Sequence, residues 1–256
     1  MLLAIDVGNT QTVLGIYEGD QLRHMWRVST NAIHTTDELR LKLRGLFLAQ
    51  EIAPRAIDGV VLASVVPALT DRWSEVGRAM FGHETRTVNF ESAQPLFSTS
   101  YANPHEIGAD RIADAVAARA LYGAPVIVVD FGTATNMEVI DAEGCFVGGI
   151  IAPGVETSMN ALFSRAARLA AIELEDPHTA IGRTTAETMQ VGIVYGEVDR
   201  VDGLIRRVFA QLGYEAPVVA TGGLATSIAP LCATVTEINS ELTLQGLRMI
   251  FEQETK

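Results

Sequence analysis

The chain has 256 residues, of which 48% are hydrophobic, and a formal net charge of −12. A chain of this length buries either one large core or two modest cores of roughly 100–150 residues each. The acidic balance, without any cluster of Lys and Arg, argues against a nucleic-acid partner, although backbone N–H groups and Mg²⁺ can still hold a phosphorylated ligand.

The N-terminal apolar run ends after five residues, at Asp6. No stretch of the sequence approaches the roughly 18–20 apolar residues that a membrane span needs. The two cysteines, Cys145 and Cys232, lack the spacing of a metal site and are expected to be reduced. We therefore expect a cytoplasmic protein with no membrane partner.

The first half of the chain is typical of a sheet followed by βαβ elements. A helix is expected to begin at Thr36, because the carboxylates of Asp37 and Glu38 suit a helix N-terminus. Another helix is expected around Leu69–Phe81. The expected strands are Leu2–Ile5, Val13–Tyr17, Leu22–Ser29, Ile57–Ser64 and Thr85–Asn89.

An alanine-rich segment in the middle of the chain, Ala109–Leu121, predicts a helix that follows a polar loop at Ser98–Pro104. We place the boundary between two domains inside or just after this helix, near residues 115–124, giving domains of residues 1–118 and 119–256. The second half then begins with a strand at Val126. Its other expected elements are helices at Gly154–Ala167, Thr185–Phe209 and Leu242–Phe251 and a strand at Pro217–Thr221.

The sequence Ile127–Thr135 is a second copy of Leu3–Gln11. Asp130 falls on Asp6 at a constant offset (130 − 6 = 124), and the offset continues through the next apolar run, where it matches Thr12 with Asn136. Each copy is typical of a strand, a tight glycine turn and two more strands. The duplication therefore indicates two like domains that close on one charged ligand.

The first turn follows a strand that ends in Asp6, and Gly8 lets the backbone approach a phosphate. Asn9 and Thr10 add donors, and Asp6 can hold Mg²⁺ through water. The turn is not a Walker loop, since GxxxxGK[ST] is missing. Taken alone, either copy is equally compatible with an ordinary hairpin.

The second turn offers a carboxylate, Asp130, and two hydroxyls, Thr133 and Thr135, for terminal phosphates or a cation. The alternative is that Thr135 and Asn136 are merely strand residues. Gly222 and Gly223 follow a buried strand and permit close approach of a flat ring or a phosphate, although a plain strand-to-helix turn is also compatible.

A fourth group of candidate residues, Gly108–Arg111, lies where a helix is expected to begin. Asp110 is placed to accept a proton from a substrate hydroxyl, and Arg111 to bind an anionic group. The alternative is that these residues have no functional role, with Asp110 a helix N-terminal residue and Arg111 a surface charge. His105 is a further residue that could line the site.

Taken together, these motifs resemble the type III pantothenate kinases, within the superfamily of acetate and sugar kinases, Hsp70 and actin. The resemblance spans essentially the whole chain. It implies an α/β fold of two duplicated ribonuclease H-like, actin-like domains, each a mixed β-sheet flanked by helices, with a ligand cleft between them. The motifs are Asp6–Thr10, Ser64–Pro67, Tyr101–Arg111, Asp130–Thr135, Gly149–Gly154, Thr185 with Met189 and Gln190, Ala220–Leu224 and Leu242–Leu247.

The resemblance implies ATP-dependent phosphorylation of pantothenate, the first step of coenzyme A synthesis. Asp110 would be the base, and Asp130 would bind a monovalent cation, K⁺ or NH₄⁺; Asp6 would hold Mg²⁺. Implied ATP-binding residues are Asp6, Val7, Gly8, Asn9, Thr10, Gln11, Thr12, Val13, Thr133, Gly222 and Gly223. Implied pantothenate-binding residues are Tyr101, Gly108, Ala109, Asp110, Arg111 and, from the neighbouring subunit of a homodimer, Thr185.

Several positions depart from the family pattern, and their effect stays open: Asn136, Glu138, Arg183, Thr184 and Asp199. Two alternatives to a pantothenate kinase also stay open. One is a related kinase or phosphatase with another small hydroxyl or polyphosphate substrate. The other is a non-catalytic accessory or regulatory protein on the same fold, against which the intact Asp110 argues.

Overall fold

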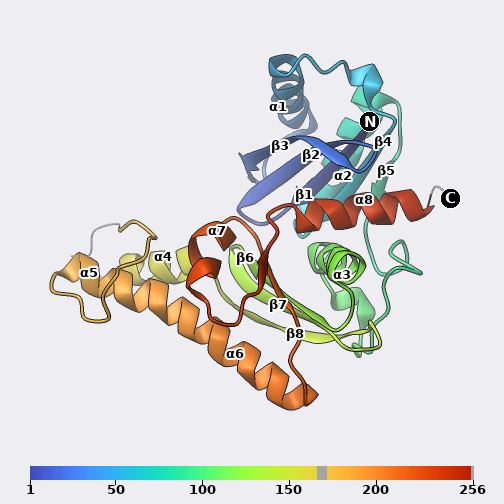
Figure 1. Cartoon of the computed structure of the whole chain (residues 1–256). Coiled ribbons are helices and arrows are strands. Elements are labelled where there is room, and N and C mark those ends of the chain that lie inside the picture. Colours follow the sequence, from blue (N-terminus) through green and yellow to red (C-terminus); the bar gives the residue numbers. More distant parts are fainter. Residues whose placement is uncertain (166–171, 255–256) are drawn as a thin grey trace. The chain divides into compact units, whose positions relative to one another are not determined.

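The computed structural model describes residues 1–165 and 172–254, and the chain divides into two compact units. The first unit comprises Met1–Ala117 and the segment from Leu242, and the second comprises Ala118–Glu241. The division drawn from the sequence left the segment from Leu242 in the second domain. The structure assigns that segment to the first unit, because the helix it forms packs on the first sheet (Figure 1).

The first unit is built on a five-stranded mixed sheet in the order β3-β2-β1-β4-β5. The central strand β1 (Leu2–Val7) runs antiparallel to β2 (Gln11–Glu18) and parallel to β4 (Gly59–Ser64). The outer strands are β3 (Gln21–Ser29) and β5 (Thr85–Thr87). The two strands that end at the same edge, β1 and β4, carry Asp6 and Ser64 at that edge.

One face of this sheet is covered by α1 (Thr36–Ala49) and α2 (Pro67–Phe81), whose apolar side chains share a core with β1, β2 and β4. The expected start of α1 is confirmed. Thr35 forms a capping box with Glu38, which satisfies N–H groups that a helix otherwise leaves without partners. Two short 3₁₀ turns, η1 (Pro54–Ala56) and η2 (Pro104–Glu106), complete the connections.

The opposite face is covered by α8 (Leu242–Glu254), which packs on β1, β2 and β4. Glycine makes this approach possible: a Cβ on Gly15 would lie 2.8 Å from a methyl carbon of Leu244, and a Cβ on Gly59 would overlap the ring of Phe251. The remaining helix, α3 (Ala109–Tyr122), contains the boundary between the two units.

The second unit repeats this plan, with a mixed sheet in the order β10-β9-β6-β7-β8. Its central strand β6 (Val126–Phe131) lies between antiparallel β7 (Ala134–Ile140) and parallel β9 (Val218–Thr221). The outer strands are β8 (Phe146–Pro153) and β10 (Glu237–Ile238). The two sheets match strand for strand, so the duplication and the fold class are confirmed; the two-residue strand β10 was not expected.

The helices of the second unit are α4 (Val155–Arg165), α5 (Thr185–Gln190), α6 (Gly196–Leu212) and α7 (Ala225–Ile228), with a 3₁₀ turn η4 (Ala229–Leu231). The long helical region expected from Thr185 is present, but a π-helix η3 (Val191–Tyr195) interrupts it. The last two residues of the helix expected at Gly154–Ala167 lie outside the described residues.

The glycine turns of the two units differ in length. The β ladder pairs Val7 with Thr12 in the first unit and Phe131 with Thr135 in the second (12 − 7 = 5 against 135 − 131 = 4). The second turn is one residue shorter, so Thr12 corresponds to Thr135. The constant offset therefore holds for β1 and β6, and the expected match of Thr12 with Asn136 is wrong.

Candidate active site

The turn after β1 is closed by its own backbone and presents exposed side chains. Gly8 N donates to the carbonyl oxygen of Gln11 at 3.0 Å, and Thr30 N donates to that of Thr10 at 2.9 Å. Asn9, Thr10 and Gln11 are exposed, whereas Asp6 is half-buried at the end of β1. The turn thus offers one carboxylate and a stretch of accessible polar groups at the sheet edge.

Two of the implied ATP-binding residues point inward. Val7 is buried in the core of the first unit, and Thr12 is buried with its hydroxyl 2.8 Å from that of Thr30. Val13 is half-buried. Any contact of Val7 or Thr12 with a nucleotide would therefore come from the backbone.

Asp110 lies at the start of α3 with its carboxylate folded back over the helix end. The backbone N–H of Arg111 donates to Asp110 Oδ1 at 2.8 Å. A Cβ on Gly108 would lie 2.5 Å from the same oxygen, so only glycine leaves room for this arrangement. Burial raises the pKa of Asp110 above its ordinary value of 3.8, against the opposing hydrogen bond and charge of Arg111.

The first unit brings this carboxylate to the sheet edge that carries Asp6. The expected side-chain position of Gly108 lies 3.6 Å from a methyl carbon of Val65, and Val65 N donates to the carbonyl oxygen of Val7 at 3.0 Å. Gly108 and Asp110 are therefore neighbours of the residues that follow β1 and β4.

The other residues implied to bind pantothenate in this unit vary in exposure. Arg111 is 8% exposed, so an anionic group bound there would meet a largely desolvated guanidinium. Ala109 is half-buried, and Tyr101 is exposed, with its backbone N–H bonded to Thr99 Oγ1 at 2.9 Å. His105 is exposed, and its ring nitrogen lies 3.4 Å from a carboxylate oxygen of Glu91.

In the second unit, Asp130 ends β6 as Asp6 ends β1. Gly222 has a left-handed φ of +94°, and a Cβ there would overlap Asp130 Oδ1 and lie 2.7 Å from the backbone of Phe131. Leu224 N donates to the carbonyl oxygen of Phe131 at 3.2 Å. The structure therefore brings Asp130 and Gly222 together, with the exposed Gly223 next to them.

Thr133 is exposed at the tip of the second turn, and its carbonyl oxygen is held from two sides. Gly154 N donates to it at 3.1 Å, and Thr157 Oγ1 donates to it at 2.6 Å. A Cβ on Gly154 would lie 2.6 Å from that oxygen and overlap the carbonyl of Gly132. The junction of β8 and α4 is therefore a support of this turn.

The hydroxyl of Thr135, expected to serve a phosphate or a cation, does not face a ligand. Its side chain is buried, and its hydroxyl donates to Glu197 Oε1 at 2.6 Å. The hydroxyl is thus committed inside the unit, and Thr133 is the threonine of this turn that faces solvent.

Asn136, one of the departures from the family pattern, lies beside Asp130. The β ladder places it directly opposite Asp130, so both side chains lie on one face of the sheet. Its Oδ1 is buried and has no hydrogen-bond partner in the described structure. A carboxylate and an orphaned amide oxygen are oxygen donors of the type that a hard cation takes.

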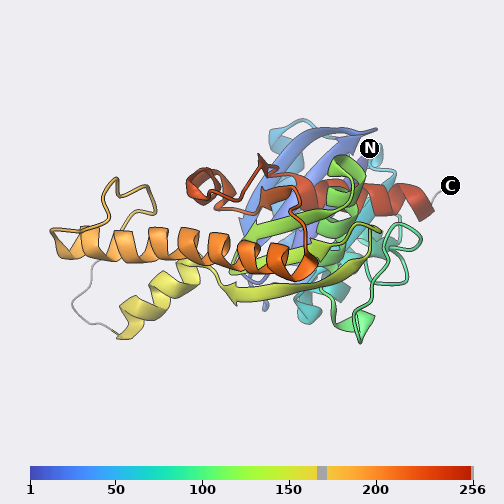
Figure 2. The same ribbon diagram turned by 60° about the horizontal axis from the view of Figure 1, so that its bottom comes forward.

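Thr185 lies on an arm of the second unit. It is an exposed residue at the start of α5, and α4 and α5 project beyond the strands of the second sheet (Figures 1 and 2). Thr184 caps the helix, with its hydroxyl accepting from Glu187 N at 3.2 Å, and Arg183 is exposed. Threonine is a good N-cap residue, which explains one departure from the family pattern.

The remaining departures fall in different environments. Asp199 is exposed in the first turn of α6, where a helix dipole favours a carboxylate. Glu138 is completely buried on the sheet face shared with Asp130 and Asn136.

Among the described residues, no group of three or more His, Cys, Asp or Glu side chains is arranged to hold a metal ion. Within residues 1–165 and 172–254, no helix has the length and apolar character needed to cross a membrane.

Solved structures with this fold include several kinases. A Baf family transcriptional activator from Campylobacter jejuni matches 99% of this chain and 98% of its own with a TM-score of 0.61 at 18% identity. A ROK hexokinase from Thermus thermophilus matches 100% and 99% with a TM-score of 0.55 at 12% identity. Similarity this low in sequence shows the fold alone, which is that of actin-like kinases with two duplicated domains.

Closer relatives identify the family. The family model for type III pantothenate kinase matches residues 2–207. The type III pantothenate kinase of Moorella thermoacetica is 46% identical over 257 aligned positions, with 100% of both chains covered. That of Thermomicrobium roseum is 45% identical, covering 99% of this chain and 97% of its own. The chain therefore belongs to the type III pantothenate kinase family.

Proposed function

We propose that Asp110 is the general base with which this chain transfers a phosphoryl group from ATP to pantothenate, the reaction of its family and the first step of coenzyme A biosynthesis. The supporting observation is the half-buried carboxylate at the start of α3, whose pKa burial raises. A base needs a pKa nearer the working pH than that of an ordinary aspartate. Asp110 would take the proton of the pantothenate hydroxyl as the terminal phosphoryl group moves to it.

Kinases of this family use ATP with a divalent metal ion. The exposed turn at Asn9–Gln11 and the carboxylate of Asp6 fit the phosphates and a hydrated Mg²⁺, because hard cations prefer oxygen ligands and keep several waters. When bound, the metal neutralises charge on the transferring group. We assign the ATP phosphates to Asp6–Val13, with Thr133, Gly222 and Gly223 as contacts from the second unit.

We assign the monovalent cation, K⁺ or NH₄⁺, to Asp130. The orphaned Oδ1 of Asn136 and the space left by the missing side chain of Gly222 support this assignment. The cation would supply positive charge beside the ATP phosphates. Asn136 would be a second ligand, and the shorter turn of the second unit places it opposite Asp130.

Pantothenate would lie against Tyr101 and Gly108–Arg111, with Arg111 binding its carboxylate. Thr185 would complete this site from the neighbouring subunit of a homodimer. The exposed position of Thr185 on the projecting arm supports this role, as does the exposure of the apolar Ile181 (77%) on the same arm. We place the enzyme in the cytoplasm, where ATP is available, without nucleic-acid or membrane partners.

Coupled ADP release with pantothenate as acceptor, with and without K⁺, tests the catalytic assignments. We expect K⁺-dependent turnover that falls by about 10²–10⁴-fold in Asp110→Asn, while pantothenate still binds in calorimetry. Equal turnover in the variant would remove Asp110 from the base role. Equal turnover without any monovalent cation would remove the cation from Asp130.

Subunit mixing tests the shared site. Asp110→Asn and Thr185→Val chains are refolded together, and each mixed dimer then contains one site with both native residues. About half of random dimers are mixed, so about a quarter of wild-type activity should return. No recovery from the mixture, or an active monomer in gel filtration, would place Thr185 outside the site.

A further inference from the structure

The turn that carries Thr133 is supported from inside the second unit by a buried carboxylate on α6. Thr135 Oγ1 donates to Glu197 Oε1 at 2.6 Å, and Thr135 is 1% exposed and Glu197 4% exposed. Thr135 is two residues from Thr133 and is the first residue of β7 that pairs with β6. The contact therefore joins the first turn of α6 directly to the turn proposed to meet ATP.

Arg200 completes this network. It forms an ion pair with the other carboxylate oxygen of Glu197, and it donates to the carbonyl oxygen of Pro153 at 2.6 Å. Pro153 ends β8, and Gly154, which follows it, donates to Thr133. Glu197 and Arg200 thus hold the turn at Thr135 and also hold the junction that supports Thr133.

Burial of this carboxylate has a cost that its partners offset. Burial raises the pKa of Glu197, and the hydrogen bond from Thr135 and the charge of Arg200 oppose that rise. A buried carboxylate is a poor choice for stability alone, since well-packed apolar residues often do as well. Its directional bonds, by contrast, fix the positions of the two elements that they join.

The corresponding threonine of the first unit has a different partner. Thr12 corresponds to Thr135, and its hydroxyl meets the hydroxyl of Thr30, on the chain just beyond β3. In the second unit, Thr135 ties the turn to the long helix α6. The π-helix Val191–Tyr195 lies immediately before α6, and π-helical turns occur often at functional sites.

From this geometry we infer that Glu197, through Thr135 and Arg200, is a positioning residue for the ATP-binding and cation-binding turn at Asp130–Thr133. The inference rests on the proposed role of Thr133 in ATP binding. Glu197 touches neither substrate; it holds the turn so that Thr133 and Asp130 are in place before the nucleotide arrives.

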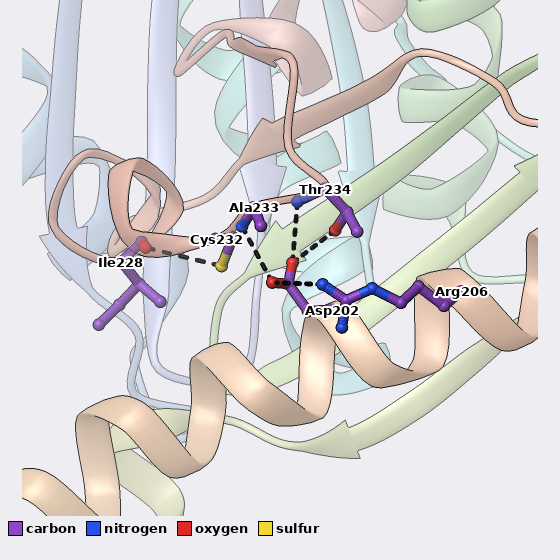
Figure 3. Close-up of polar contacts among 6 residues, drawn as sticks. All are labelled: Asp202, Arg206, Ile228, Cys232, Ala233 and Thr234. Carbon is purple, nitrogen blue, oxygen red and sulfur yellow. Dashed lines mark hydrogen bonds and ion pairs between the residues drawn. The ribbon is translucent and has the colours of Figure 1, made fainter. Parts of the chain in front are cut away.

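The same helix supplies a matched control. Asp202, also on the buried face of α6, accepts hydrogen bonds from Ala233 N and Thr234 N at 2.9 Å each and from Thr234 Oγ1 at 2.7 Å (Figure 3). Arg206 lies 3.4 Å from it, one helical turn on. Asp202 is therefore as buried and as fully hydrogen-bonded as Glu197. The segment that it holds is the loop after η4, whereas Glu197 holds the turn that carries Thr133.

The test compares Glu197→Ala, Glu197→Gln, Thr135→Val and the Glu197→Ala/Thr135→Val double variant with Asp202→Asn. We expect the KM for ATP to rise about tenfold in Glu197→Ala and Thr135→Val, with kcat and the KM for pantothenate within about twofold. The KM for ATP of the double variant should be no higher than that of the more affected single variant, because the two substitutions remove the same hydrogen bond. Glu197→Gln, which keeps an acceptor for Thr135, should recover part of the loss.

Amide hydrogen exchange gives a readout that is independent of activity. Exchange at Gly132 and Gly154, whose N–H groups close and support the turn, should speed up in Glu197→Ala by more than the loss of overall stability explains. In Asp202→Asn it should speed up by no more than the loss of overall stability explains. A rise in the KM for ATP in Asp202→Asn equal to that in Glu197→Ala would overturn the inference, as would lower thermal stability with an unchanged KM in the Glu197 variants. Thr133→Ala separates the two proposals: if it too leaves the KM for ATP unchanged, the assigned role of Thr133 fails.

Discussion

The carboxylate of Asp130 occupies the space in which a side chain on Gly222 would begin. Gly222 is the first residue after β9, and Asp130 is paired with Thr221 in the parallel ladder. The end of one strand thus closes over the carboxylate that ends its neighbour. Any side chain at position 222 must push Asp130 or the backbone of Phe131 aside.

Gly222→Ala should therefore abolish most of the activation by K⁺ and raise the KM for ATP. The matched control is Gly213→Ala, because Gly213 also has a left-handed φ, +81°, but has open space around it. That control should lose about 1–2 kcal/mol of stability and keep its K⁺ response. Titration of activity with K⁺ in both variants checks the prediction, and identical K⁺ curves would contradict it.

Gly132 and Gly154 should respond to alanine in opposite ways. A Cβ on Gly132 would lie 3.5 Å from its nearest neighbours, an ordinary contact, whereas a Cβ on Gly154 would overlap the second turn. Gly132→Ala should fold with stability within about 0.5 kcal/mol of wild type but bind ATP poorly, because a methyl group there would block a phosphate. Gly154→Ala should be unstable. Urea unfolding and ATP titration of each variant separate these outcomes, and normal ATP affinity in Gly132→Ala would place the phosphates elsewhere.

On the acidic side of the pH–rate profile, the rate should fall at a pH above the ordinary pKa of an aspartate. Burial raises the pKa of Asp110 from its ordinary value of 3.8, and a general base works only when deprotonated. The rate should therefore fall as the pH drops through this raised pKa. The profile of kcat/KM for pantothenate against pH, at saturating ATP, measures this acidic limb, because this ratio reports the pKa values of the enzyme before pantothenate binds. A limb at or below 3.8, or one that persists in the residual activity of Asp110→Asn, would assign it to another group.

Asp202 should make the second unit sensitive to strong acid. Burial disfavours its charged form, but hydrogen bonds from Thr234 and Ala233 and the charge of Arg206 outweigh burial and hold the pKa of Asp202 below its ordinary value of 3.8. A depressed pKa contributes stability above the unfolded value, and that contribution is lost as the pH falls through the folded value. Asp202→Asn should cost about 1–3 kcal/mol at neutral pH and less in acid. Urea unfolding of the wild type and of Asp202→Asn, from neutral pH to strong acid, measures the difference between their free energies of unfolding. This difference should shrink as the pH falls, and a constant difference would contradict the prediction.

The sequence predicted the strands and the duplication well because buried strands carry continuous apolar runs. Leu2–Val7 and Val126–Phe131 could be matched residue by residue. The shorter second turn could not be predicted, since pairing across a hairpin depends on backbone geometry that Thr133 and Ala134 do not reveal. The two-residue strand β10 has too few residues to give a pattern.

The candidate site was predictable where a residue type is unusual for its place, as with Asp6, Asp130 and the glycines beside them. The roles of Thr135 and Glu197 were not, because a threonine near a phosphate turn and a glutamate on a helix are compatible with solvent exposure. Only the fold shows that both side chains are buried against each other. Long-range pairs of this kind leave no local signal in a single sequence.

Because α8 belongs to the first unit, that unit is made of two segments that are separated in the sequence by the whole second unit. Residues 118–241 leave the ribosome as one uninterrupted unit, whereas β1, β2 and β4 lack the cover of α8 until residues 242–254 follow. Domains generally fold as units as they emerge. The half of the chain that is translated first is therefore expected to finish folding last, with the small-residue face around Gly15 and Gly59 uncovered until α8 has been synthesised.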